Sequence, residues 1–159
     1  MSIDFDQAFR SAVADPAALK TIATIDEHGV PHLEENNSIH LNGDDRLVLL
    51  ELNEYSRTNR NLVRSIWFDK KIAIHLRSKG RSFEVVASPY KVVIAGPVFE
   101  GYYRAQQEKG GDIALSTVWL IDAESVTEET APLRFAREAA GRLPVLHLDR
   151  LARSPSLPA

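Results

Sequence analysis

Residues 19–33 read LKTIATIDEHGVPHL, and the order of strand and turn signals in this stretch decides the fold. Apolar and polar side chains alternate over LKTIATI, a pattern that is typical of a β-strand with one buried face. The turn residues DEHG follow, and VPHLEENNSIHLN then continues as extended chain to a second turn at NGDD. Extended structure resumes in RLVLLEL, residues 46–52. The sequence therefore predicts a three-stranded meander.

Three further extended segments follow along the chain. They are KKIAIHLRS at 70–78, SFEVVASPYKVVIAGPVF at 82–99 and STVWLIDAESVT at 116–127. Pro89 interrupts the second of them and marks an edge or a bulge, because proline cannot donate to a sheet ladder. The segments lack the regular strand and helix alternation of a doubly wound sheet. They predict a small, mainly β, six-stranded antiparallel barrel with short added helices.

Four segments have helical patterns. Phe5, Phe9 and Val13 are spaced by four residues before Pro16, and a second helix is expected to begin at Arg57. EGYYRAQQEKGG at 100–111 predicts a helix that the glycine pair closes. TAPLRFAREAAG at 130–141 has a threonine at the cap position, a proline in the first turn and a glycine at the exit.

Length and composition narrow the class of protein. The 159 residues fit one domain over 1–159, with the barrel at about 19–127 and a C-terminal helical extension at about 130–153. The net charge of −3 argues against a general nucleic-acid binder. Cysteine is absent, and neither a leader peptide nor an apolar run of membrane length is visible, so we expect a cytoplasmic protein.

The histidines do not predict a metal site. The chain has five, and none of them forms the close pair found on a metalloenzyme helix. Structural or solvated roles are the commoner ones for such histidines. We therefore expect no bound metal.

The segment EYSRTNRNL, residues 54–62, concentrates hydrogen-bond donors where a helix should begin. Ser56 is placed to cap that helix, and Arg57 and Thr58 lie in its first turn, where backbone N–H groups lack partners. Such a helix start suits a phosphate monoester. In the alternative reading, Ser56 only caps, and Arg57, Arg60 and Arg64 form a solvated stripe. No Walker loop or dinucleotide fingerprint accompanies the segment, which argues against a nucleoside triphosphate or an NAD held in a Rossmann domain.

Polar residues also interrupt the expected second strand. One parity of HLEENNSIHL places Leu33, Glu35, Asn37, Ile39 and Leu41 on one face, so two polar side chains break an otherwise apolar row. A slip of one residue would exchange the two faces. The alternative is a bulge or an edge strand whose polar residues face water.

The ordered set of these segments, from about Leu19 to Val126, resembles the FMN-binding split barrels of the pyridoxamine 5'-phosphate oxidase-like superfamily. TIATIDEHGVPHL and SRTNRNL carry most of the likeness, together with the long strand that ends AGPVFE. The resemblance implies a split barrel of the Greek-key type and FMN as cofactor. It implies that the phosphate is held by Ser56, Arg57, Thr58 and Asn61. It also implies that the isoalloxazine ring is lined by Asn36, Asn37, Ser38, Glu51 and Leu52.

The resemblance further implies a homodimer with the flavin in the subunit cleft, and an oxidoreductase that uses a small-molecule donor such as NADH or NADPH. The chain departs from the oxidases in carrying Thr58 where they have lysine and in placing the acidic Glu51 near the ring. It is therefore closer to the small FMN-binding proteins than to the oxidase. Two alternatives stay open. One is a non-catalytic split barrel that binds flavin, haem or a deazaflavin, and the other is a ligand-free β domain acting through protein contacts.

Overall fold

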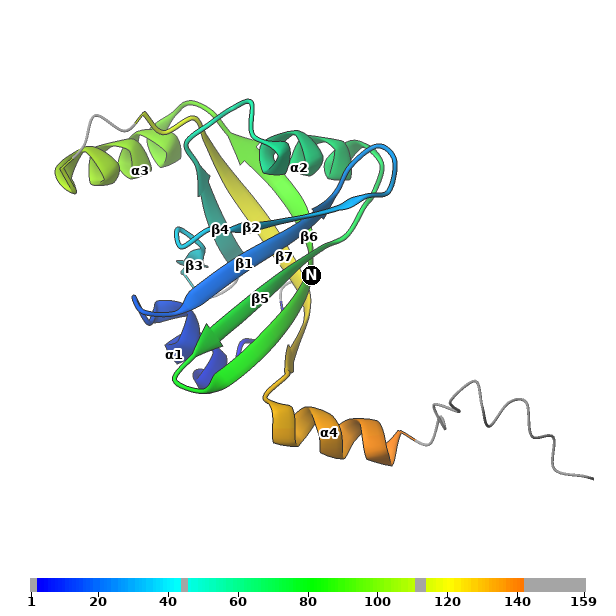
Figure 1. Cartoon of the computed structure of the whole chain (residues 1–159). Helices are drawn as coiled ribbons and strands as arrows, with labels where there is room; N and C mark the ends of the chain where they lie inside the picture. Colours follow the sequence, from blue (N-terminus) through cyan, green and yellow to red (C-terminus); the bar gives the residue numbers. More distant parts are fainter. Residues whose placement is uncertain (1–2, 44–45, 111–113, 142–159) are drawn as a thin grey trace, which may run out of the picture.

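The computed structural model describes residues 3–43, 46–110 and 114–141. In these ranges seven strands form one antiparallel sheet in the order β2-β1-β5-β6-β7-β4-β3 (Figure 1). The strands are β1 (Leu19–Ile25), β2 (Pro31–Glu35), β3 (His40–Asn42), β4 (Arg46–Glu51), β5 (Ile72–Ser78), β6 (Arg81–Val93) and β7 (Thr117–Glu128). The helices are α1 (Gln7–Ala14), α2 (Arg57–Trp67), α3 (Pro97–Glu108) and α4 (Ala131–Ala140).

The sheet curls around a core that α1 and α2 cover from opposite ends (Figure 1). Alternate residues of β1 and β5 point inward, as the sequence periodicity predicts. Phe9 of α1, Leu62 of α2 and Trp119 of β7 are fully buried together with Ile22 of β1. A smaller cluster lies between β4, β7 and α3, where Val48 and Val118 pack against Phe99 and Tyr102. The core therefore fixes α2 across the sheet, which positions its N-terminus.

The prediction of six strands is wrong by one, and the barrel is not closed. The expected second strand breaks after Glu35 into β2 and β3, which lie at opposite edges of the sheet. Residues 36–39 cross between these edges. Lys20 and Ser38 join the edges here: Lys20 Nζ donates to the Ile39 carbonyl oxygen at 2.7 Å, and Ser38 Oγ accepts the Leu50 N–H at 2.9 Å. Side chains thus bridge the gap that a closed ladder would fill.

The break also changes which residues of β2 face inward. Leu33 is 69% exposed, whereas His32 and Glu34 are half-buried. The predicted apolar face through Leu33 and Glu35 is therefore the outer face of β2. Alternation fails as a guide here because a turn between two strands resets the register.

Several local predictions are confirmed. Ser56 caps α2, since its Oγ accepts the Asn59 N–H at 2.9 Å. The pairing of β6 with β7 shifts register between Pro89 and Lys91, which is the predicted bulge. None of the helices within the described ranges is long and apolar enough to cross a membrane.

The two later helices differ in detail from the prediction. α3 begins at Pro97 rather than near residue 100, and Gly110, with φ of 84°, follows its end. α4 begins after Thr130 as predicted, but the threonine side chain makes no capping bond. Its Oγ1 instead accepts the Ser82 N–H and donates to Glu128. The remainder of the predicted extension, residues 142–153, lies outside the described residues.

Candidate functional site

The start of α2 carries two hydroxyl groups that the protein's own carboxylates hold. Ser56 Oγ donates to Glu51 Oε2 at 2.9 Å, and Thr58 Oγ1 donates to Glu34 Oε2 at 2.6 Å. Glu51 is buried and also accepts the Asn53 N–H. Negative charge near a helix N-terminus is favourable because of the helix dipole. These carboxylates therefore stabilise α2 and occupy the hydroxyls that were predicted to hold phosphate.

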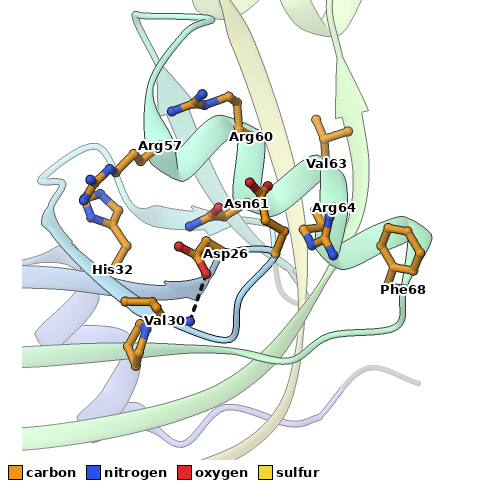
Figure 2. Close-up of a pocket in the computed structure, with 11 residues that line it drawn as sticks. Asp26, Val30, His32, Arg57, Arg60, Asn61, Val63, Arg64 and Phe68 are labelled. Atoms are coloured by element: carbon orange, nitrogen blue, oxygen red, sulfur yellow. Dashed lines mark hydrogen bonds between the residues drawn. The ribbon is translucent and has the colours of Figure 1, made fainter.

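A cavity of about 430 Å³ lies along the same helix, between α2 and the β1–β2 turn (Figure 2). Arg57, Arg60 and Arg64 line one side of it. Asp26 and His32 line the other side, and Asp26 accepts the Val30 N–H. That bond, aided by the N–H of His28 and the positive charge of Arg57, lowers the pKa of Asp26. The three arginines outnumber the cavity's carboxylates, Asp26 and Glu27, so an anion would be attracted to it.

Asn61 lies on the wall of this cavity and also anchors the helix. Its Nδ2 donates to Thr24 Oγ1 at 2.9 Å, and both residues are buried. The bond ties α2 to β1. Asn61 therefore has a structural role that the sequence pattern did not reveal.

A second cavity, of about 340 Å³, collects every residue predicted to line the ring. Its lining consists of Glu34, Glu35, Asn36, Asn37, Ser38, Leu50, Glu51, Leu52 and Gln106. Ser38 Oγ lies 2.5 Å from Asn36 Oδ1, and Asn37 is exposed with its Nδ2 on Glu35. The wall offers amide and carboxylate groups beside the apolar Leu50 and Leu52. Such a mixture suits a planar heterocycle that has both polar edges and an apolar face.

Glu34 separates the two cavities, and sequence reasoning missed it. Its carboxylate holds Thr58 and lies 3.8 Å from His32 Nε2, while His32 lines the first cavity and Glu34 the second. The adjacent acids Glu34 and Glu35 were the available signal, but their facing depended on a register that the sequence left open. Within the described ranges, no three potential metal ligands come together.

Comparison with known proteins places the fold. No protein-family model and no curated protein matches the sequence. Among solved structures, HupZ of Group A Streptococcus superposes with a TM-score of 0.66 at 19% identity, over 80% of this chain and 95% of that one. An FMN-binding protein from Syntrophomonas wolfei superposes with a TM-score of 0.61 at 13% identity, over 75% of this chain and 82% of that one. A pyridoxamine 5'-phosphate oxidase candidate from Lactobacillus delbrueckii superposes with a TM-score of 0.59 at 17% identity, over 78% of this chain and 93% of that one.

These matches define the class of fold to which the chain conforms, the split barrel of the FMN-binding and pyridoxamine 5'-phosphate oxidase-like proteins. The resemblance inferred from the sequence is thereby confirmed at the level of the fold. At these identities the matches show the fold alone.

Proposed function

We propose that this protein binds FMN and acts as a flavin-dependent oxidoreductase. The observation that carries the proposal is the convergence of Asn36, Asn37, Ser38, Glu51 and Leu52 on one cavity beside the start of α2. The ring would lie against these residues. The ribityl phosphate would extend past Thr58 toward Arg57. The FMN-binding protein of Syntrophomonas wolfei, which shares the fold, supports a flavin as the ligand.

The residues of the two cavities fit FMN, but two of the four residues predicted to hold its phosphate, Ser56 and Thr58, already donate to carboxylates. Arg57 is exposed at the cavity wall, and the first N–H groups of α2 lack intrahelical acceptors. Ser56 and Thr58 would reach a phosphate only by leaving Glu51 and Glu34. Phosphate binding would therefore rest mainly on Arg57 and the helix amides, with Asn61 shaping the wall.

A bound flavin would supply the electron or hydride transfer, with NADH or NADPH as the proposed donor. The chain's part is to orient the ring and to exclude water from one of its faces. Leu50 and Leu52 would cover the apolar face, while Asn36 and Ser38 would offer polar groups to an edge of the ring.

Reconstitution tests the proposal. The full-length protein is titrated with FMN and, in parallel, with riboflavin, haem and a deazaflavin, each followed by absorbance and by isothermal titration. We expect saturable FMN binding and bleaching of the bound flavin by NADH or NADPH under anaerobic conditions. Haem or deazaflavin binding without FMN would favour the non-catalytic alternative. If the protein binds none of the four ligands, the result would favour the alternative of a ligand-free β domain that acts through protein contacts.

We further propose that the protein is a homodimer, because exposed apolar side chains surround the cavity that Arg57, Arg60 and Arg64 line, called here the arginine cavity. Val30, Val63 and Phe68 line the cavity and are exposed, and Trp67, one turn after Val63, is 79% exposed. Contiguous exposed apolar residues of this kind usually mark an interface. A second copy covering them would enclose the cavity and remove this apolar area from water.

Trp67→Asp is expected to convert the dimer to a monomer, since it places a charge in the apolar interface. Light scattering coupled to gel filtration measures the change in mass. Phe135→Asp is the matched control, because Phe135 is exposed on α4, away from this patch. A wild-type chain that stays monomeric at high concentration would contradict the proposal.

A further inference from the structure

A cavity of about 500 Å³ between α1, β3 and α3 adjoins the proposed flavin site and extends beyond it. It is lined by Val13, Ala14, Asp15, Pro16, Lys20, Asn37, Ser38, Ile39, His40, Leu50, Tyr102, Ala105, Gln106 and Lys109. It shares Asn37, Ser38, Leu50 and Gln106 with the proposed ring cavity. Its volume lies within the range of sites that hold small molecules.

Lys20 gives this cavity a buried positive charge. The residue is only 6% exposed, and burial lowers the pKa of Lys20 while the nearby Asp15 opposes that shift. The ammonium has three N–H donors, and the Ile39 carbonyl takes one of them at 2.7 Å. The carboxylate of Asp15 is engaged elsewhere, since it accepts from Ser78 Oγ and the Ala17 N–H. Lys20 can therefore donate to a further acceptor in the cavity.

Tyr102 and His40 form a second polar group on the same wall. His40 Nδ1 lies 2.6 Å from the Ser38 carbonyl oxygen, and this contact assigns the proton of the neutral imidazole to Nδ1. His40 Nε2 then accepts from the Tyr102 hydroxyl at 3.1 Å. The Tyr102 hydroxyl has one proton, and rotation about its C–O bond can turn that proton from His40 Nε2 toward a ligand.

We propose that this cavity is a binding site for a small carboxylate with an apolar body, such as an aromatic carboxylate. Lys20 donates to the carboxylate, and Lys109 adds positive charge. The Tyr102 hydroxyl becomes a second donor when it turns its one proton from His40 Nε2 to the carboxylate. Val13, Leu50 and Ala105 contact the apolar body. A monoanion matches one buried ammonium, because a buried charge is stable only when it is paired.

The test uses 2-naphthoate and its uncharged counterpart 2-naphthamide, titrated into the full-length protein without flavin and followed by ligand fluorescence. We expect naphthoate to bind at least about tenfold more tightly than the amide, since a hydrogen bond to an ionised group exceeds a neutral one. Lys20→Met should remove most of that preference. Lys91→Met, at an exposed lysine of β6, is the control for the change in net charge.

Tyr102→Phe provides an independent variant, because Lys20→Met also removes the bond to Ile39 and must first be shown to fold by circular dichroism. It should weaken naphthoate binding several-fold and leave the amide unaffected. NMR adds a readout that does not depend on affinity. Naphthoate should raise the pKa of Lys20, because a bound anion favours its charged form. Asp15, His40, Tyr102 and Lys109 are the other titratable groups that line this cavity.

Equal affinity for the acid and the amide, or naphthoate binding that leaves the pKa of Lys20 unchanged, would overturn the inference. The experiment contains no flavin, and Lys20 lines this cavity but not the proposed ring cavity, so the effect of Lys20→Met reports on this site and not on the flavin site. Naphthoate binding by a protein that fails to bind any flavin would support this site while removing the flavoprotein proposal.

Discussion

Asn59→Leu is expected to lower the free energy of unfolding by about 3 to 5 kcal/mol, the cost of leaving several buried polar groups without partners. Asn59 Oδ1 accepts from Trp119 Nε1 at 2.8 Å and from Thr117 Oγ1 at 3.2 Å. Its Nδ2 donates to the Glu54 carbonyl oxygen at 2.8 Å. Trp119 is fully buried and has one N–H that no water can reach. The leucine would match the volume and supply none of these bonds.

Urea unfolding followed by circular dichroism measures the loss, and a double-mutant cycle with Trp119→Phe isolates the bond. Once the indole N–H is gone, Asn59→Leu should cost less, by about 1 kcal/mol or more. Asn42→Leu is the control at an exposed asparagine of β3. Strictly additive effects of Asn59→Leu and Trp119→Phe would show that the bond does not stabilise the fold.

Arg57→Ala is expected to weaken FMN binding by about 1.5 to 3 kcal/mol, the range for a hydrogen bond to a charged group. Riboflavin, which lacks the phosphate, should bind the variant and the wild type equally. Isothermal titration with both ligands separates the phosphate contribution from that of the ring. Arg104→Ala removes an arginine from the exposed face of α3 and serves as the control for net charge.

Glu34→Gln should have the opposite effect and raise the affinity for FMN. The Glu34 carboxylate holds Thr58 and lies close to the proposed phosphate position, so the substitution removes a negative charge that would repel the phosphate. FMN should bind this variant more tightly than the wild type, while riboflavin should be little affected. If Arg57→Ala weakens the binding of FMN and of riboflavin equally, Arg57 affects binding through the fold or the dimer and not through a contact with the phosphate.

Much of the local structure was predictable, since short-range rules govern it. The alternation in LKTIATI, the capping hydroxyl of Ser56 and the bulge at Pro89 each depend on neighbours a few residues away. The grouping of Asn36, Ser38 and Glu51 on one cavity came from resemblance rather than from pattern. Whether these residues bind a flavin is still a prediction.

The sequence by itself determined the strand periods, the start of α2 and the mainly β class of this protein, because backbone geometry and side-chain alternation operate locally. Only the tertiary structure decided that residues 31–42 divide into β2 and β3 at the two edges of the sheet. It also decided that Glu34 accepts a hydrogen bond from Thr58, 24 residues further along the chain. It also decided that Asn59 accepts the indole N–H of Trp119. Such pairings join residues far apart in the chain, and their geometry exists only once the sheet has curled and α2 has packed across it.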